Sequence, residues 1–302
     1  MSGNGRTGNG RNTVVNIMLL LGAVRWYNLA LIVLSQYCIA WFVFLPQTEI
    51  QHLLQDLRLH LIVLSTSLSL GGAFVINGFY DMDKDLVNHP QRVVLFRLLG
   101  QNFMLNMYAL ITVVSLLLAL AASLKVFVFV AFLVFMFWFY SHKLQKLPLI
   151  REIAGTLLAI SPLIAIWLHY GKMHIGFAMY MSSLAMVGFT REVVKDLTGN
   201  KGNLIFGYQT VVVATSQGFA KRWLAWVNVL LASCHAIGLF TLIKKWDYFA
   251  LISSFSIVAA LVMSLSLLLT RSENSYRIAD TLLKAVIVIH LLSLAVSDFI
   301  VF

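Results

Sequence analysis

Four polar side chains recur at helical spacing where a long apolar run ends, within residues 75–90. Asn77, Asp81 and Asp85 lie four residues apart and Asn88 follows at three, so one helix would carry all four side chains along one stripe. Carboxylate and amide oxygens are hard ligands, which suit magnesium and a diphosphate better than zinc or haem. Charge at the mouth of a membrane helix is costly and usually marks a site, although a solvated helix end followed by a turn would contain the same residues.

A second polar group lies in residues 188–203, where another apolar segment ends. Asp196 follows Arg191 and Lys195 there, and a turn rich in Gly and Asn comes next. If both groups lie at the same end of a bundle, two acidic helix ends could hold one diphosphate through bridging magnesium ions, with Arg191 and Lys195 neutralising the remaining phosphate charge. Anchoring at a membrane face would account for Arg191, Lys195 and Lys201 without any ligand.

The composition identifies the broad class of protein. Hydrophobic residues make up 60% of the 302 positions and charged residues 11%, whereas a soluble domain is nearer half apolar and a quarter charged. The chain is therefore predicted to be a polytopic membrane protein. Its two cysteines, Cys38 and Cys234, have no C-x-x-C spacing and support neither a disulfide framework nor a zinc site. The net charge of +10 is explained by membrane lipids and topology, and no segment resembles a nucleic-acid module.

Apolar runs near the length of a bilayer crossing predict nine helices. Their centres fall in residues 26–45, 60–78, 104–122, 125–140, 150–169, 174–190, 223–243, 248–270 and 281–301. Residues 1–13 are predicted to be a disordered polar tail, and residues 14–302 a single transmembrane domain without a cleaved signal peptide. With the N-terminus inside, 17 of the 22 Lys and Arg residues fall on the inner side, so we expect a multi-pass protein of the cell inner membrane with a cytoplasmic N-terminus.

These residues resemble the UbiA superfamily of intramembrane prenyltransferases. Its first signature, N-D-x-x-D-x-x-x-D followed by N-x-P, matches NGFYDMDKDLVNHP at Asn77, Asp81, Asp85, Asn88 and Pro90, with Gly78 in place of an acid. RWYNL resembles the family's R-P-x-N-L through Arg25 and Asn28. YSHKLQKLPLI resembles Y-[ST]-x-x-L-K-x-x-P-L through Tyr140 and Pro148, with Gln145 at the usual lysine and Lys143 and Lys146 beside it.

The second signature, commonly R-E-x-x-K-D-x-E-D-x-x-G-D and then G-x-x-T-x-P, is matched less completely. The matching residues are Arg191, Glu192, Lys195, Asp196, Gly202, Gly207 and Thr210. Thr198, Gly199 and Asn203 stand where the family has acids, and Val212 stands where it has proline. The remaining oxygen ligands near Asp196 are the amides of Asn200 and Asn203, which bind magnesium more weakly than carboxylates do.

The resemblance implies an all-α integral membrane protein, a bundle of nine transmembrane helices with a cytoplasmic polar cap and a lateral opening to the lipid. It implies transfer of a prenyl group from a polyprenyl diphosphate to a hydrophobic aromatic or lipid acceptor, assisted by Mg²⁺ at Asp81, Asp85 and Asp196. The residues expected to contact the substrates are Asn77, Asn88, Arg92, Arg25, Asn28, Tyr140, Lys143, Lys146, Arg191, Lys195 and Asn200.

Two other interpretations stay open at this point. A prenyltransferase fold with eroded catalysis could bind isoprenoid lipid, and the depleted second signature is the argument for it. A secondary transporter would also place acids at helix breaks, but near the midplane of the membrane and not at one face. The sequence contains no motif that selects the acceptor, the prenyl chain length or the oligomeric state.

Overall fold

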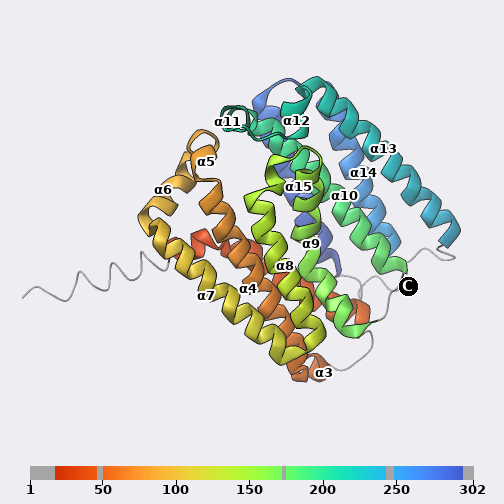
Figure 1. The fold of residues 1–302 in the computed structure, drawn as a ribbon. Coiled ribbons are helices and arrows are strands. Elements are labelled where there is room, and N and C mark those ends of the chain that lie inside the picture. Colours follow the sequence, from red (N-terminus) through yellow and green to blue (C-terminus); the bar gives the residue numbers. More distant parts are fainter. Residues whose placement is uncertain (1–17, 46–49, 172–174, 243–247, 295–302) are drawn as a thin grey trace, which may run out of the picture.

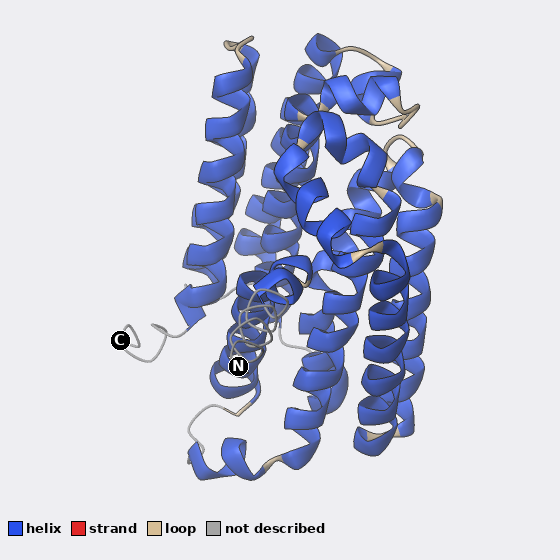
Figure 2. Ribbon diagram, turned by 90° about the vertical axis from the view of Figure 1, so that its left-hand side faces the viewer, coloured by secondary structure: helices blue, strands red, loops and turns tan. Residues whose placement is uncertain are grey.

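The computed structural model describes residues 18–45, 50–171, 175–242 and 248–294, and these ranges contain helices and no strand (Figures 1 and 2). The predicted all-α class is therefore confirmed. The predicted disordered tail, residues 1–13, lies outside the described residues.

Within the described ranges, nine long helical segments form the bundle. They are α2 (Trp26–Ile39) continued by the π-helical turn η1 (Ala40–Phe44), α4 (Leu57–Tyr80), α7 (Gln101–Ala122), α8 (Leu124–His142), α9 (Ile150–Tyr170), α10 (Ile175–Thr198), α13 (Gln217–Leu242), α14 (Tyr248–Leu268) and α15 (Glu273–Ser293). Shorter helices connect them: α3 (Ile50–Gln55), α5 (Met82–Asn88), α6 (Pro90–Leu99), the 3₁₀ turn η2 (Leu144–Lys146), α11 (Asn200–Ile205) and α12 (Val211–Ala214). In Figure 1, α5, α6, α11 and α12 lie at one end of the bundle and α3 at the opposite end.

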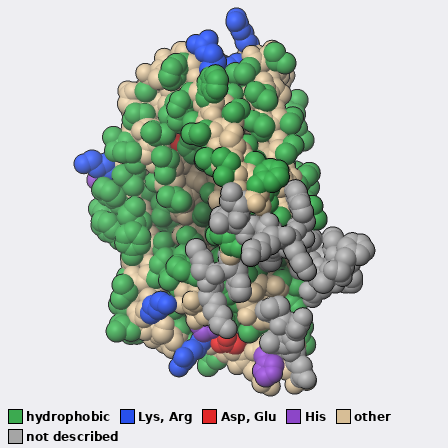
Figure 3. Space-filling view, turned by 90° about the vertical axis from the view of Figure 1, so that its right-hand side faces the viewer, with side chains coloured by type: hydrophobic (Ala, Val, Ile, Leu, Met, Phe, Trp, Pro, Cys, Tyr) green, Lys and Arg blue, Asp and Glu red, His purple; other side chains and the backbone are tan. Residues whose placement is uncertain are grey.

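Within the described part of the chain, seven helices are long and apolar enough to cross a bilayer. The other two long helices, α10 and α15, have 24 and 21 residues but carry clusters of charged residues at the end where the short helices lie. Large apolar side chains remain exposed along the bundle, and Figure 3 shows hydrophobic side chains over most of one side. A lipid environment would cover these faces, so the chain is an integral multi-pass membrane protein.

Two of the groups of buried apolar residues are large. One joins α2, η1, α3 and α4 to α7, α8, α9, α10 and the end of α15, and the other joins α10 to α12, α13, α14 and α15. Because α10 and α15 contribute to both groups, they connect the two parts of the bundle. The charged end of α10 is thereby held opposite the end of α4.

The first polar group lies on two helices instead of one. Helix α4 ends at Tyr80, Asp81 has φ −88° and ψ 1°, and α5 begins at Met82. The prediction of one uninterrupted helical stripe was therefore wrong, although the Asp85 N–H still donates to the Asp81 carbonyl at 2.8 Å and keeps the four-residue spacing. Pro90 then opens α6 and restricts the residue before it to extended backbone, which ends α5.

The last predicted helix was displaced along the chain. The apolar scan centred it on residues 281–301, whereas α15 runs from Glu273 to Ser293 and residues 295–302 lie outside the described ranges. The first three turns of α15 are rich in charged residues, which an apolar scan reads as loop. This shift brings Asp280 and Lys284 onto a helix beside the charged end of α10.

Candidate active site

Asp81 is buried at the junction of α4 and α5, with 6% of its surface exposed. The Asn77 side-chain amide donates to Asp81 Oδ2 at 2.9 Å, and the Lys84 ammonium donates to Oδ1 at 2.8 Å. The hydroxyl of Tyr208 also donates to Oδ1, at 3.3 Å. Burial and the Asp81 carboxylate raise the pKa of Tyr208, so this hydroxyl stays protonated and able to donate. Three donors thus hold the Asp81 side chain in one orientation.

Asp85 lies one turn further along, on α5, and is also buried. Burial raises its pKa, and the negative charge of Asp81 raises it further, while Lys84, Arg92 and Arg25 oppose the shift. The Arg92 guanidinium is 4.0 Å from Asp85 Oδ2. Two carboxylates that repel each other in a partly dry site form an arrangement that a divalent cation would stabilise.

Basic groups surround this pair. Arg25 has left-handed backbone angles, φ 52° and ψ 55°, and its guanidinium lies 4.8 Å from the centre of the Phe74 ring. Partial burial and then the charges of Arg92, Lys195, Arg25 and Lys84 lower the pKa of His89 to about 4. Burial is the larger cause of this shift, and the four bases that add to it place positive charge at this rim. The region is therefore suited to an anion.

The second polar group is organised around a buried ion pair between α9 and α10. The Arg151 guanidinium contacts Asp196 Oδ1, and Asp196 has only 1% of its surface exposed. Asp196 Oδ2 has no hydrogen-bond partner. Leu149, just before α9, has φ 67° and closes a three-residue turn in which the Ile150 N–H donates to the Pro148 carbonyl at 2.8 Å. This strained turn aims the first residues of α9 at α10.

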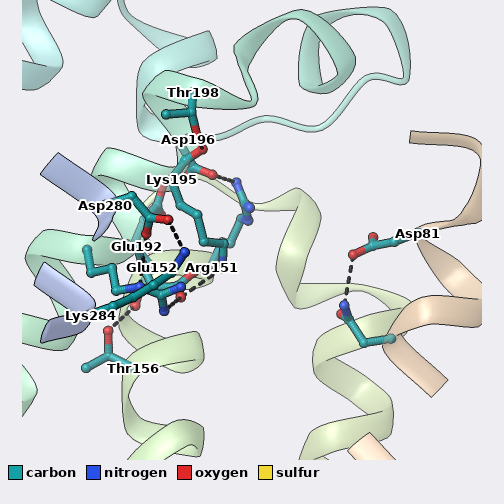
Figure 4. Close-up of polar contacts among 12 residues, drawn as sticks. Asp81, Arg151, Glu152, Thr156, Glu192, Lys195, Asp196, Thr198, Asp280 and Lys284 are labelled. Carbon is teal, nitrogen blue, oxygen red and sulfur yellow. Dashed lines mark hydrogen bonds and ion pairs between the residues drawn. The ribbon is translucent and has the colours of Figure 1, made fainter. Parts of the chain in front are cut away.

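Every other acid at this end of α9, α10 and α15 also has a partner. Glu152 accepts from the backbone N–H of Val211 at 3.0 Å, and both oxygens of Glu192 accept from Lys195, at 2.8 and 2.7 Å. Asp280 is paired with Arg191 and Lys284, at 3.0 and 2.5 Å (Figure 4). Four acids, Asp196, Glu152, Glu192 and Asp280, therefore lie among four bases, Arg151, Lys195, Arg191 and Lys284, and the group is close to neutral.

Asn88 and Tyr208 connect the two groups. The Asn88 amide donates to the Gly199 carbonyl at 3.1 Å, and its oxygen accepts from the Gly202 N–H at 3.0 Å, which fastens α5 to the turn between α10 and α11. Tyr208 reaches Asp81 from the loop after α11, and Lys84 lies 4.2 Å from the centre of its ring. A cavity of about 640 Å³ opens beside this junction and is lined by residues of α5, α6, the end of α10 and α15.

The predicted site residues fall into two sets. The first set meets at one end of the bundle through the contacts above and consists of Asn77, Asp81, Asp85, Asn88, Arg92, Arg25, Arg191, Lys195 and Asp196. Tyr140 joins them, because its hydroxyl and the Glu192 carboxyl both lie beside Gly155, 3.0 and 3.7 Å from where a Cβ of that residue would stand.

The remaining predicted residues lie at the margin of the site. Lys146 is exposed and lies 5.7 Å from the centre of the Tyr208 ring, and Lys143 is exposed. Asn28 is half-buried on the first turn of α2, and the Asn200 side-chain oxygen is buried without a partner. The structure gives none of these four a bond to an aspartate of the site.

The sequence reasoning gave Glu192 as a motif match without a role, and it missed six other residues of the site: Lys84, Arg151, Glu152, Tyr208, Asp280 and Lys284. Two local signals could have found some of them. Arg151 and Glu152 are charges at the start of an apolar helix, the criterion that singled out Asp81. Lys84 stands three residues after Asp81, at the spacing of a helical ion pair.

Packing explains one departure from the family signature. Gly78 stands where the family has an acid, and a Cβ there would lie 2.2 Å from the ring of Phe96 on α6. No side chain fits at that position while α6 packs on α4. The usual lysine of the middle motif is Gln145, whose amide donates to the Ser141 carbonyl at 2.6 Å.

The two polar groups differ in how well they suit magnesium. In the described residues no three His, Cys, Asp or Glu side chains converge to hold a metal alone. Mg²⁺ commonly binds through one or two carboxylates together with substrate phosphates, and Asp81 with Asp85 provides such a pair. Asp196 is different, because the guanidinium of Arg151 already occupies one of its oxygens.

The described part of the chain is thus an all-helical membrane bundle with paired aspartates and several bases at one end. The sequence profile of the UbiA prenyltransferase family matches residues 35–284. The chain therefore belongs to the UbiA prenyltransferase family, which confirms the resemblance drawn from the motifs.

Relatives and solved structures agree with this assignment. The digeranylgeranylglyceryl phosphate synthase of Thermococcus gammatolerans is 29% identical over 189 residues, which are 61% of this chain and 65% of that protein. The Pyrococcus furiosus enzyme of the same name is 27% identical over 143 residues, 47% of this chain and 51% of that protein. The chain thus matches between half and just under two thirds of the length of these relatives.

The fold is shared more completely than the sequence. The structure of a digeranylgeranylglyceryl phosphate synthase superposes with a TM-score of 0.71 at 16% identity, covering 94% of this chain and 99% of that one. A UbiA homologue from Archaeoglobus fulgidus bound to GPP and Mg²⁺ superposes with a TM-score of 0.67 at 17% identity, covering 91% and 99%. The family's fold therefore extends over nearly the whole chain.

Proposed function

We propose that this protein is a membrane prenyltransferase that moves a prenyl group from a polyprenyl diphosphate to a lipid acceptor. The observation that carries the proposal is the pair Asp81 and Asp85, buried side by side at the end of a membrane bundle and surrounded by bases. Carboxylates would bind the magnesium of a magnesium–diphosphate complex, and the bases that face them would bind its phosphate oxygens. Long apolar helices would accommodate the prenyl chain.

In this proposal Asp81 and Asp85 hold Mg²⁺, which would stabilise the negative charge that develops on the diphosphate as the allylic carbon–oxygen bond breaks. Asn77 and Tyr208 fix the orientation of Asp81 through their hydrogen bonds. Arg92 and Arg25 lie beside Asp85 and supply positive charge toward the phosphate oxygens. The packed apolar helices hold the chain and keep water from the allylic cation. Tyr140, near Glu192, offers a ring to that cation.

The membrane arrangement is proposed as nine spans, with α10 and α15 completing the seven apolar helices. The bases gathered at the site end support a cytoplasmic polar cap and a cytoplasmic N-terminus in the cell inner membrane. We place the lateral lipid opening at the recess among hydrophobic side chains in Figure 3. The single domain over residues 14–302 is part of the same proposal. Cysteine labelling of Lys201→Cys and Arg58→Cys from opposite sides of the membrane tests it, and labelling from the same side would contradict it.

The acceptor is proposed to be a glycerol-phosphate lipid. The relatives named above are digeranylgeranylglyceryl phosphate synthases, and the basic rim at His89 and Arg92 would suit an anionic headgroup. The cavity of about 640 Å³ beside this rim provides room for such a group.

Binding measurements on the paired aspartates test the proposal. Asp85→Ala should abolish magnesium-dependent binding of geranylgeranyl diphosphate, because it removes one of two carboxylates that hold the metal. Glu273→Ala is a matched control, since Glu273 pairs with Lys201 on the exposed surface and should leave binding unchanged. Wild-type binding by Asp85→Ala would show that the carboxylates form only a solvated helix end.

A second candidate function rests on the neutral group around Asp196. Arg151 forms an ion pair with Asp196, and three acids of the second signature are absent. A protein of this fold could therefore bind isoprenoid diphosphate without turnover. Magnesium-dependent binding without any prenylated product would favour this function over catalysis.

A further inference from the structure

The guanidinium of Arg151 lies where the sequence predicts a second magnesium. Asp196 was expected to hold that metal, yet its Oδ1 contacts Arg151 and both side chains are buried, with 1% and 6% of their surfaces exposed. A guanidinium stays protonated at any pH relevant to a protein. The cation beside Asp196 is therefore permanent and belongs to the chain.

The neighbouring acids leave little attraction for a further dication. Glu192 is bound through both oxygens by Lys195, and Asp280 lies between Arg191 and Lys284. The positions where the family has acids hold Thr198, Gly199 and Asn203. A Cβ on Gly199 would lie 3.3 Å from the Asn88 amide nitrogen and from the Lys195 carbonyl oxygen, so this turn is too tight for a larger residue without adjustment.

Arg151 is also turned toward the first polar group. Tyr208 donates to Asp81, and the charge of Arg151 acts on the same tyrosine. Figure 4 shows Arg151 on the side of its cluster that is turned toward Asp81. A diphosphate held at Asp81 and Asp85 would thus have a fixed guanidinium on its opposite side.

We propose that Arg151, held by Asp196, supplies the positive charge that a second magnesium would otherwise supply, so that the protein binds a prenyl diphosphate with one divalent ion. The inference rests on the proposed function of the site, because it assumes that a diphosphate binds between the two groups. Arg151 suits the role, since its planar fork donates parallel hydrogen bonds to phosphate oxygens while one edge remains on Asp196.

Metal stoichiometry tests this directly. Mn²⁺ is titrated into the purified protein with saturating geranylgeranyl thiolodiphosphate, an analogue that ionises slowly, and free Mn²⁺ is followed by electron paramagnetic resonance. The wild type should bind one analogue-dependent ion per chain. Two ions per chain would overturn the inference, whereas no binding of the analogue at all would instead contradict the proposed function.

Variants of the ion pair provide a second readout. Arg151→Gln should weaken binding of the analogue roughly 10- to 100-fold, as expected when a charge-assisted hydrogen bond is lost, and Arg151→Lys should recover part of it. Since Arg151→Gln alone leaves a buried charge, Arg151→Gln with Asp196→Asn removes the pair together and should show the same loss with one ion still bound. Lys201→Gln, on the exposed surface, is the control for charge. If the double variant binds the analogue as the wild type does, Arg151 has no role in binding the diphosphate.

Discussion

The side-chain amide of Asn88 forms a clamp through its hydrogen bonds to Gly199 and Gly202, and adding a single methyl group can break it. A Cβ on Gly202 would lie 2.5 Å from the Asn88 amide nitrogen and 2.6 Å from its oxygen and Cγ, closer than real side chains approach. In Gly202→Ala the Asn88 amide must swing away and lose its bonds to Gly199 and Gly202. At about 0.5–1.5 kcal/mol for each bond, the free energy of unfolding should fall by roughly 2 kcal/mol.

Thermal unfolding in detergent measures this effect. A loss of about 2 kcal/mol corresponds to a Tm lower by several degrees, at roughly 2–4 °C per kcal/mol for a large chain. Magnesium-dependent diphosphate binding should weaken as well, because α5 and the α10–α11 turn are no longer fastened together. Gly218→Ala is the matched control, since nothing lies within 4 Å of its Cβ and alanine favours the helix by up to about 1 kcal/mol.

A double-mutant cycle decides whether the clamp is the cause. Asn88→Ala removes the amide that the new methyl group would strike, so Gly202→Ala should cost little when added to Asn88→Ala. The coupling energy should be close to the cost of either single variant, about 2 kcal/mol. If Gly202→Ala costs the same in both backgrounds, or costs nothing, the reasoning about the clamp is refuted.

Three further outcomes follow from the first polar group. Burial and Asp81 raise the pKa of Asp85, so the stability contributed by its protonated form is complete below the unfolded value of about 3.9 and is lost as the pH rises through the folded value. Asp85→Asn should therefore raise the Tm of the metal-free protein near neutral pH, and the gain should vanish in acid; a pH-independent difference would contradict this. Lys84→Met breaks a buried ion pair and should cost about 3 kcal/mol without metal, and the rise in Tm on adding Mg²⁺ should exceed that of the wild type. An equal rise in both proteins would show that Mg²⁺ does not compensate Asp81. Gly78→Asp restores the family's acid but strikes Phe96, so its Tm should fall and recover with Phe96→Ala; an unchanged Tm would show that the contact is not tight.

The sequence alone was enough to select the residues that meet at one end of the bundle as a candidate site. Asp81, Asp85 and Asp196 were identified because charge at the end of an apolar run is costly and needs a reason. Apolar length also located most of the long helices: six of the nine predicted segments match an observed helix to within three residues at each end, whereas α10 runs eight residues further and α13 begins six residues earlier than predicted. Both inferences depend on local composition, which the sequence contains directly.

The sequence did not predict which acidic side chain pairs with which basic side chain. Arg151 and Asp196 are 45 residues apart and meet only because α9 packs against α10. Asp280 joins the site because α15 starts earlier than its apolar part indicates. The break at Asp81 likewise depends on the packing of α5 against α11, which spacing within one helix does not reveal. Tertiary packing therefore decided the ion pairs, and the metal preference of each group follows from those pairs.

The most direct test of the proposed activity is product formation by the purified protein. Radiolabelled geranylgeranyl diphosphate is incubated with Mg²⁺ and a glycerol-phosphate lipid acceptor, and the products are separated by chromatography. The account predicts a prenylated lipid that forms only with Mg²⁺ and is absent with Asp85→Ala. Tight, magnesium-dependent binding of the diphosphate with no product from this acceptor, or from a whole membrane lipid extract, would contradict the account and assign the chain a lipid-binding role.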